Sequence, residues 1–295
     1  MKQKNPKVTI IVPVFNEEKY IGKLLDSFNK QSFNEFFEII IVDGLSTDKT
    51  KKKVFDYKRR KSKFELNYFV NEHRRTPFAF NIGIKNAKAD FFAIVGAHSI
   101  LDKDWLLNSY KGLVNLSEEY AGIGGAWINK HHNTFVTKSI SYATSTFWGG
   151  GISSYRFSKE PHDADTVPFG LYRKKIVEEI GFFDTDFLIG QDAEFNMRIR
   201  KKGYKLLFDP SIKLKYYVRR NLKSFAKQML HYGIARLRII KKHRVLNLVQ
   251  LIPLFYVSYL ILLVPLMFIS YFFALPFLFH TLFTAFFSLK TKKLF

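Results

Sequence analysis

The chain has 295 residues, and its 47 Lys and Arg against 25 Asp and Glu give a formal net charge of +22. Such a charge predicts an anionic partner, and nucleic acid, a phosphorylated substrate and a membrane surface all qualify. Cysteine is absent, which excludes disulfides and thiolate metal sites. The length allows one large domain and an appendage.

The N-terminal residues "MKQKNPK" run directly into a strand pattern, so no secretory signal peptide is expected. Short apolar runs rich in β-branched residues then alternate with segments of helical spacing. This alternation predicts an α/β fold with a mainly parallel sheet flanked by helices. The expected strands are residues 7–15, 37–44, 65–70 and 90–97, and the expected helices are residues 16–31, 46–60 and 76–88.

Polar residues that directly follow these strands are the first candidates for a binding site, because ligands of such sheets bind beyond the carboxyl ends of the strands. No G-x-G-x-x-G motif and no P-loop follows any expected strand. The main sequence evidence for a dinucleotide-binding protein or a P-loop nucleotide-binding protein is therefore absent. The candidates are Asn16 and Glu17, Asp43 to Asp48, and Gly96 to Ser99.

The turn "VDGLSTDKT" places Asp43 and Asp48 close to the hydroxyls of Ser46 and Thr47. A carboxylate at the end of a strand can accept a hydrogen bond from a base N–H or a ribose hydroxyl. A turn followed by a helix cap at Ser46 or Thr47 explains the same residues. Both interpretations stay open at this point.

The segment "GQDAEFNMRIRKKGY" predicts a helix that ends at Gly203 and carries a Glu194–Arg198 pair four residues apart. Asp192 lies at the N-terminal end of this helix. Its carboxylate is a candidate general base, and an N-terminal helix cap is the alternative.

Taken together, several motifs resemble family 2 glycosyltransferases of the GT-A fold. They are "TIIVPVFNEEKYIGKLLDSF", "IIIVDGLSTDKT", "RTPFAFNIGIKNAKADFFAIVGAHS", "VPFGLYRKKIVEEIGFFD" and "GQDAEFNMRIRKKGYKL". The chain is similar in particular to the succinoglycan-type exopolysaccharide glycosyltransferases, over roughly residues 7–240. Each motif is weak alone, and their order and spacing make the resemblance specific.

The resemblance implies a GT-A type sheet and a nucleotide-diphosphate-sugar as the donor. It assigns Asp43 to the base and places Arg75 beside it, where a guanidinium can also serve phosphates. Core packing is the alternative explanation for Phe15, and strand punctuation is the alternative for Pro13. The nucleotide-binding residues implied are Pro13, Phe15, Glu17, Asp43, Ser46, Arg75 and Ala97.

Members of this family usually hold a divalent cation, Mn²⁺ or Mg²⁺, at the corner that reads "VGAHS" here. The resemblance implies an Asp at the first position, and this chain has Gly96, which offers no side-chain ligand. His98 is the expected metal ligand, and imidazole favours Mn²⁺ over Mg²⁺. A purely structural histidine is the alternative, and Asp102 and Asp104 lie downstream within possible reach.

The resemblance also assigns the role of catalytic base to Asp192, in an inverting sugar transfer. Residues 141–170, rich in Gly, Ser and aromatic side chains, are expected to form a loop that suits the acceptor. The Q-x-x-R-W signature of processive synthases is missing, which favours the addition of one sugar per encounter.

The C-terminal part is apolar: no Asp, Glu, Lys or Arg occurs from Leu246 to Leu289, a stretch of about 44 residues where about 20 cross a bilayer. It predicts a transmembrane helical hairpin that turns near residues 273–276, and a buried core is the alternative. Because basic residues concentrate on the cytoplasmic side, "KKHR" and "KTKK" at its ends predict a cytoplasmic catalytic domain at the cell membrane. The predicted parts are residues 1–240 as the GT-A domain, including a basic amphipathic segment at 216–244, then residues 245–289 as the hairpin and residues 290–295 as a basic tail.

The sequence therefore predicts a membrane-anchored, inverting glycosyltransferase that acts on a lipid-linked or polysaccharide acceptor in cell-surface polysaccharide biosynthesis. A catalytically silent scaffold that binds a nucleotide sugar is the alternative, and Gly96 is its best support. Nucleic acid is not an expected partner, because no nucleic-acid recognition module is present.

Overall fold

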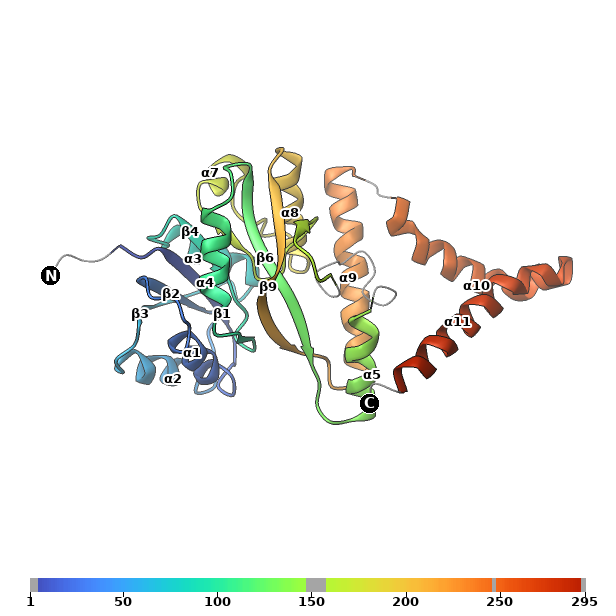
Figure 1. Cartoon of the computed structure of the whole chain (residues 1–295), viewed down its shortest axis with the longest axis horizontal. Helices are drawn as coiled ribbons and strands as arrows, with labels where there is room; N and C mark the ends of the chain where they lie inside the picture. The colour runs from blue at the N-terminus through green and yellow to red at the C-terminus, as the bar shows by residue number, and fades with distance from the viewer. Residues whose placement is uncertain (1–4, 147–157, 246–247, 293–295) are drawn as a thin grey trace. The chain divides into compact units, whose positions relative to one another are not determined.

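A computed structural model describes residues 5–146, 158–245 and 248–292 of the chain. They belong to two compact units, Met1–Arg238 and Ile239–Phe295. The first unit holds the sheet and its helices, and the second is helical (Figure 1).

The first unit is built on one sheet with the strand order β3-β2-β1-β4-β8-β6-β9-β5, and β7 pairs with β9 (Figure 1). Strands β1 to β4 are parallel to their neighbours among themselves, as the repeated strand–helix alternation predicts. The strands are β1 (Val8–Val14), β2 (Phe37–Asp43), β3 (Phe64–Val70), β4 (Phe91–Ile94), β5 (Ile100–Leu101), β6 (Tyr120–Lys130), β7 (His162–Asp163), β8 (Leu171–Arg173) and β9 (Lys205–Tyr217).

The prediction of a mainly parallel sheet is wrong for the remaining strands, and the sheet is mixed. Strand β8 lies between β4 and β6 and runs antiparallel to both. Strands β5 and β7 are antiparallel to β9, whereas β6 and β9 are parallel. The regular alternation stops after β4, so the local pattern carries no information about the direction of these later strands.

Helices cover both faces of the sheet because successive residues of β1 point to opposite faces. Ile10 and Val12 belong to a buried cluster with Leu24 of α1, and Ile11 belongs to a second cluster with Phe80 of α3. The helices of this unit are α1 (Ile21–Asn29), α2 (Thr50–Lys58), α3 (Thr76–Lys85), α4 (Trp105–Val114), α5 (Phe135–Thr144), α7 (Ile176–Ile180), α8 (Gln191–Lys201) and α9 (Leu222–His243), whose last residues pass into the second unit.

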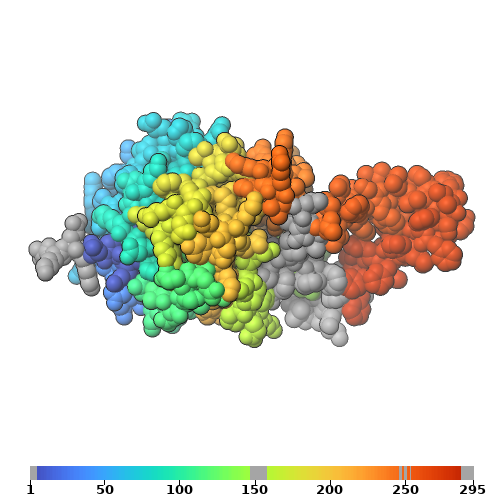
Figure 2. Space-filling model, turned by 90° about the horizontal axis from the view of Figure 1, so that it is seen from above, coloured from blue at the N-terminus to red at the C-terminus, as the bar shows by residue number. Residues whose placement is uncertain are grey.

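The surface of the first unit combines segments that are far apart in the sequence. In the space-filling view, the cyan, green and yellow segments lie against one another (Figure 2). A site on this unit can therefore draw residues from several strand–helix connections.

The second unit contains η2 (Leu248–Leu251), α10 (Ile252–Ile269), η3 (Tyr271–Ala274) and α11 (Leu275–Lys292). The Tyr259 hydroxyl of α10 donates a hydrogen bond to the Phe273 carbonyl at 2.7 Å and accepts one from the Phe277 N–H at 3.1 Å. The turn thus falls close to the predicted position. Among the residues described, no helix has both the length and the apolar character needed to cross a membrane, and the predicted transmembrane hairpin is not confirmed.

Candidate active site

The carboxyl ends of β1 to β4 meet at one edge of the sheet. Backbone hydrogen bonds continue past the strand ends and hold the connections there. The Gly44 N–H donates to the Val14 carbonyl at 2.9 Å, and the Asn71 N–H donates to the Asp43 carbonyl at 2.7 Å. The polar residues that follow these strands are therefore neighbours, as parallel strands require.

Asp43 is buried at the end of β2, and both of its carboxylate oxygens have donors within the protein. Oδ1 accepts from the N–H and the hydroxyl of Ser46, at 3.0 and 2.6 Å, and Oδ2 accepts from the Tyr68 hydroxyl at 2.6 Å. Burial, together with this hydrogen bond to Asp43, raises the pKa of Tyr68. Asp43 thus shapes the turn, and only its remaining lone pairs are available to a ligand.

Ser46 connects this turn to the end of β1. Its hydroxyl accepts a hydrogen bond from the Asn16 N–H at 2.9 Å, and Asn16 Oδ1 accepts one from the Thr47 N–H, also at 2.9 Å. Asn16 has a φ of +54°, a left-handed conformation that asparagine tolerates. The two connections therefore form one hydrogen-bonded ledge.

The N-cap position of α2 is Lys49, which corrects the expected cap at Ser46 or Thr47, and Asp48 just before it binds the first residue of the helix. Its Oδ1 accepts from the N–H and the hydroxyl of Thr50, at 2.9 and 2.6 Å. Burial opposes ionisation of Asp48, but hydrogen bonds from Thr50 and Glu18 outweigh it and lower the pKa. Of the two carboxylates in this turn, Asp48 therefore has a structural role.

Phe15 and Pro13 lie at the end of β1 but in different surroundings. Pro13 is half-buried and pairs in register with Val42 of β2. The Phe15 residue is 52% exposed, which excludes core packing as the reason for its presence. An exposed aromatic ring beside this ledge is free to stack on a base.

Arg75 is exposed and forms the N-cap position of α3. The buried Asn71 reaches it, because the Asn71 side-chain amide donates to the Arg75 carbonyl at 2.9 Å. The other side-chain atom, Asn71 Oδ1, is buried and has no hydrogen-bond partner. A buried acceptor without a donor is costly, and a ligand N–H is one group that could satisfy it.

Sequence reasoning missed Asn71. The signal was available, because Asn71 directly follows β3 at the same edge of the sheet and meets the criterion that selected Asn16 and Asp43.

The corner after β4 places His98 at the surface and Ala97 in the interior. His98 Nδ1 lies 3.6 Å from Glu17 Oε1, so the structure brings together two residues that were predicted separately. Asp104 does not reach back to this corner, because its Oδ1 accepts from the Ser32 hydroxyl at 2.7 Å.

The residues described contain no group of three or more His, Asp or Glu side chains that could hold a metal ion. One imidazole and one carboxylate still suit a cation that takes its other ligands from a substrate diphosphate and water. Gly96 leaves space beside this pair, since an added Cβ would meet nothing closer than 3.7 Å.

Asp192 is the second residue of α8. The helix begins at Gln191, directly after Gly190, whose backbone is left-handed. Asp192 Oδ1 accepts from the Ala193 N–H at 2.8 Å. The residue reaches the surface, but its carboxyl is crowded by protein atoms. This desolvation raises the pKa of Asp192, and the nearby N–H groups and Arg236 partly oppose the increase.

Residues in β8 and just before it lie near both Asp192 and Gly96. Tyr172 of β8 has a raised pKa, caused first by burial and then by the charge of Asp192. Phe169, just before β8, would lie 3.8 Å from a Cβ at residue 96. Among the residues described, no hydrogen bond or ion pair joins Asp192 directly to Asp43 or His98.

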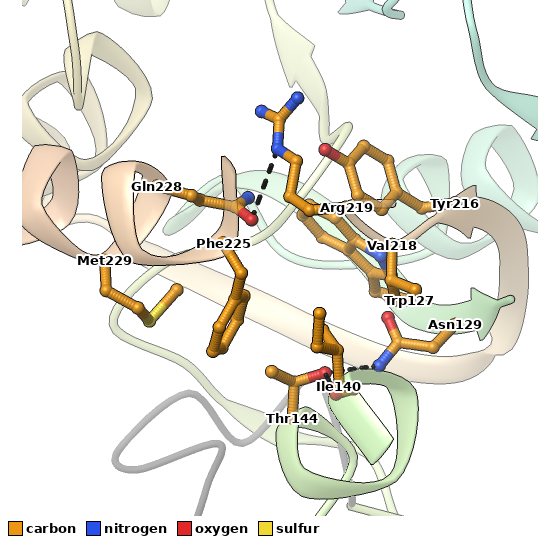
Figure 3. Close-up of a pocket in the computed structure, with 10 residues that line it drawn as sticks. All are labelled: Trp127, Asn129, Ile140, Thr144, Tyr216, Val218, Arg219, Phe225, Gln228 and Met229. Carbon is orange, nitrogen blue, oxygen red and sulfur yellow. Dashed lines mark hydrogen bonds between the residues drawn. The ribbon is translucent and has the colours of Figure 1, made fainter. Parts of the chain in front are cut away.

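A pocket opens between the ends of β6 and β9 and the helices α5 and α9 (Figure 3). It encloses roughly 270 Å³, part of which is open solvent. Arg219 and Gln228 are hydrogen-bonded on one side of it, and Trp127 and Tyr216 lie close together on another (Figure 3). The ring centroids of Tyr216 and His98 lie 5.7 Å apart, so Tyr216 lies between the pocket and the His98 corner.

Part of the expected acceptor loop, residues 147–157, lies outside the described residues. In the part that is described, Asp165 forms an ion pair with Arg200 at 2.9 Å, and His162 packs on Phe208. Both side chains therefore have structural partners.

Two family models match the chain. Glycosyl transferase family 2 matches residues 9–181, and Glycosyl transferase family group 2 matches residues 168–289. The chain is 40% identical to the dolichyl N-acetyl-alpha-D-glucosaminyl phosphate 3-beta-D-2,3-diacetamido-2,3-dideoxy-beta-D-glucuronosyltransferase of Methanococcus voltae, over 83% of this chain and 77% of the relative. It is 24% identical to the succinoglycan biosynthesis protein ExoA of Rhizobium meliloti, over 83% and 74%.

Solved structures share the fold. The mannosyltransferase PcManGT of Pyrobaculum calidifontis, in complex with GDP-Man and Mn²⁺, matches with a TM-score of 0.61 and 18% identity, over 83% of this chain and 66% of that chain. TarS 1-349 of S. aureus, in complex with UDP-GlcNAc, matches with a TM-score of 0.53 and 22% identity, over 73% and 59%. This chain therefore spans two thirds or less of these solved chains. Because one family model covers more than half of the chain, and a relative at 40% identity covers most of it, the chain belongs to glycosyl transferase family 2.

Proposed function

We propose that this glycosyltransferase moves a sugar, with inversion, from a nucleotide-diphosphate-sugar to a lipid-linked or polysaccharide acceptor. The observation that carries the proposal is Asp192, a carboxylate with a raised pKa at the N-terminus of α8. The ion pairs within 4.0 Å among the described residues do not include Asp192, so no cation weakens its basicity by direct contact.

Asp192 is the base in this proposal. Its carboxylate takes the proton of an acceptor hydroxyl while that oxygen attacks the anomeric carbon of the donor sugar. The bond between the anomeric carbon and the diphosphate oxygen breaks on the opposite face, and the nucleotide diphosphate leaves with the electron pair. Attack from the opposite face inverts the anomeric centre.

The ledge formed by the connections after β1 and β2, together with the connection from β3 to α3, binds the nucleotide. Phe15 offers an exposed ring for the base, Asn71 Oδ1 offers a free acceptor, and the Arg75 guanidinium offers a cation for phosphates. The matched solved structures contain UDP-GlcNAc and GDP-Man, which supports a nucleotide sugar as the donor class.

Glu17 and His98 would hold a divalent cation at the donor diphosphate. When bound, that cation would offset the negative charge that develops on the leaving diphosphate. The Mn²⁺ in the mannosyltransferase that shares this fold supports this choice of metal, and the mixed nitrogen and oxygen donor set of Glu17 and His98 agrees with it.

The second unit is the part that associates with the membrane in this proposal, and the first unit faces the cytoplasm. The uncharged stretch from Leu246 to Leu289 and the exposed apolar side chains of α10 and α11 support it. The Methanococcus voltae relative is named for a dolichyl phosphate derivative, which supports an acceptor that is itself bound to a membrane.

The experiment that tests the proposal measures transfer from a panel of nucleotide sugars to lipid-phosphate-linked sugars as a function of pH. Asp192→Asn should lose about 10²- to 10⁴-fold in kcat while binding the nucleotide diphosphate normally. The wild type should lose kcat as the pH falls through the pKa of Asp192, above the ordinary value of 3.8, since only the ionised carboxylate is a base.

Asp186→Asn removes an exposed carboxylate from the loop before α8 and serves as the matched control, with unchanged kcat. Turnover that is equal in wild type and Asp192→Asn would refute the assignment of the base. Nucleotide binding without any turnover across the panel would favour the silent scaffold.

A further inference from the structure

The cavity between α5, α9 and the ends of β6 and β9 is lined mainly by apolar and aromatic side chains. Trp127 and Ile140 lie on one side of it, and Phe225 and Met229 of α9 lie on the other (Figure 3). Its volume of roughly 270 Å³, part of which is open solvent, is below the range of about 300–1,000 Å³ that holds a whole drug-sized ligand. The cavity therefore suits the head and the first carbons of a larger molecule.

Two polar side chains in this lining already bind other parts of the protein. The Asn129 side-chain amide donates to the Ser141 carbonyl at 3.0 Å and to the Thr144 hydroxyl at 2.8 Å. The Gln228 side-chain amide donates to the Tyr232 hydroxyl at 2.9 Å. A carbohydrate is recognised through many hydroxyl groups, and it would find few free donors among these side chains.

Arg219 is the cation of the lining, and most of its donors have no partner among the described residues. Its Nε donates one long hydrogen bond to Gln228 Oε1 at 3.4 Å, and the ion pairs of the described residues do not include it. A guanidinium can bind a phosphate with two parallel hydrogen bonds. No described residue that lines the cavity is acidic, and the sequence has no Asp or Glu after Asp209, so no carboxylate competes for Arg219.

Tyr216 places the cavity beside the corner proposed to hold the cation. Its ring lines the cavity and lies 4.3 Å from the Trp127 ring and 5.7 Å from the His98 ring, measured between centroids. His98 and Glu17 are the residues proposed to act at the donor diphosphate. The donor would therefore lie about one aromatic ring away from a ligand in the cavity.

Helix α9 leads from the cavity to the turn before α8. Met229 lines the cavity, and Ala235 follows it on the helix by about 9 Å along the axis. A Cβ added to Gly190 would lie 2.6 Å from the Ala235 Cβ, so α9 packs against the turn from which α8 and Asp192 begin. A ligand held in the cavity can therefore extend towards both the donor and the proposed base.

We propose that this cavity binds the lipid-phosphate end of the acceptor. The phosphate pairs with Arg219, the first carbons of the lipid chain lie against Phe225 and Met229, and the sugar extends past Tyr216 towards Asp192. The inference rests on the proposed function and selects its lipid-linked acceptor. A polysaccharide of neutral sugars would leave Arg219 without an anion and the apolar lining without a partner.

The chain has no cysteine, so a single introduced thiol can report whether the cavity is occupied. In full-length Met229→Cys, the rate of modification by a small maleimide measures how far a ligand covers the lining. Decyl phosphate should slow this modification at an about tenfold lower concentration than decyl glucoside, which lacks the charge. Phe135→Cys is the control, since Phe135 is 85% exposed and lies outside the lining, and its modification should not change.

Substitutions at Arg219 test the phosphate contact in the Met229→Cys background. Arg219→Gln should remove the preference, so that decyl phosphate and decyl glucoside protect the thiol at similar concentrations. Arg219→Lys should retain part of the preference, because lysine keeps the charge but not the paired donors. Arg220→Gln is the matched control and should keep it, because Arg220 is the neighbouring exposed arginine and does not line the cavity.

Three results of the thiol measurement would overturn the inference. The first is equal protection by the two compounds, or protection by neither, when Arg219 is intact. The second is a preference for decyl phosphate that survives in Arg219→Gln or is lost equally in Arg220→Gln. The third is stronger protection by maltohexaose than by decyl phosphate, which would assign the cavity to a polysaccharide acceptor.

Transfer to a lipid-phosphate-linked sugar gives a second readout. Arg219→Gln should raise the KM for this acceptor about tenfold and leave kcat near the wild-type value, because the residue binds the acceptor away from the reacting atoms. Its affinity for the nucleotide diphosphate should not change. Protection by decyl phosphate together with an unchanged KM would show that the cavity holds a phospholipid headgroup, and would overturn its role in acceptor binding.

The thiol measurement needs no turnover, so the inference and the proposed function can fail separately. If Asp192→Asn retains full turnover, the proposed base is wrong whatever occupies the cavity. If Asp192→Asn is inactive and decyl phosphate does not protect Met229→Cys, Asp192 remains the base and only the assignment of the cavity fails.

Discussion

Gly96 occupies the position where the resemblance to family 2 glycosyltransferases implies a carboxylate, and its surroundings would accept one. The nearest atoms to an added Cβ are Ser99 Oγ at 3.7 Å and carbons of His98 and Phe169 at 3.8 Å, which are ordinary contact distances. The backbone there is not left-handed, so a side chain introduces no strain. The absence of a side chain at residue 96 is therefore not a consequence of crowding.

Gly96→Asp should consequently fold normally and bind Mn²⁺ more tightly in the presence of a nucleotide diphosphate. One added carboxylate beside Glu17 and His98 is expected to strengthen binding about tenfold, or about 1.4 kcal/mol. Isothermal titration calorimetry measures the affinity. Gly22→Asp is the control, because a Cβ at Gly22 meets nothing within 4 Å and lies on α1. Equal affinities in Gly96→Asp and the wild type would show that no cation binds at this corner.

Asp43 and Asp48 lie in one turn, and the sequence allows either ligand binding or helix capping for their carboxylates. In the structure Asp48 accepts from the first N–H of α2, and Asp43 organises the turn through Ser46 and Tyr68. Tyr68 lies on a different strand from Asp43, so the local sequence pattern does not predict their hydrogen bond.

The pairing of β6 with β9 has two register shifts, and the larger of them is a bulge after Gly125. Gly125 pairs with Asp209 and Ala126 pairs with Lys213, so three residues of β9 have no partner on β6. A Cβ at Gly125 would lie 1.9 Å from the Ile212 carbonyl oxygen. The bulge therefore depends on a glycine at this position.

Gly125→Ala should lower the free energy of unfolding by at least about 1–3 kcal/mol, because backbone atoms must move to admit the methyl group. Urea unfolding followed by circular dichroism measures the change. Gly233→Ala in α9, where a Cβ meets nothing within 4 Å, is the control and should stabilise the chain by about 0.5–1 kcal/mol. Similar effects at both positions would contradict the packing described for the bulge.

At the level of elements, the strands and helices up to β4 were predicted within a few residues of their bounds. They depend on short-range periodicity, which a single sequence contains. The antiparallel direction of β8 was not predicted, because it depends on how the chain returns to the sheet after β6 and α5. The prediction of the base at the start of α8 remains open to experiment.

The second compact unit of the chain also differs from the first in composition. The second unit, Ile239–Phe295, contains the uncharged stretch, and its described helices expose large apolar side chains such as Ile261 at 73% and Leu282 at 70%. Exposed apolar surface of this extent is typical of a segment that contacts lipid or another protein.

Lysine substitutions test the membrane association of the full-length chain. Ile261→Lys and Leu282→Lys together should reduce co-flotation with anionic phospholipid vesicles, because a lysine in a bilayer interior costs about 2.5–3.5 kcal/mol. Phe135→Lys is the matched control, since Phe135 is 85% exposed but lies in the first unit. Complete release of the wild type by high salt would show instead that the basic surface alone holds it to the vesicles.

Periodicity, composition and motif order were sufficient to recognise the family, the α/β architecture, the edge of the sheet where the candidate polar residues meet, and the apolar character of the C-terminal part. These are local properties, since strand and helix periods and the residues that follow a strand can be read over short windows. The Tyr68 donor to Asp43, the pairing of Glu17 with His98 and the unpartnered Asn71 Oδ1 came only from the folded chain. The first two join residues that are far apart in sequence, and the burial of Asn71, like these contacts, depends on how the whole sheet and its helices pack.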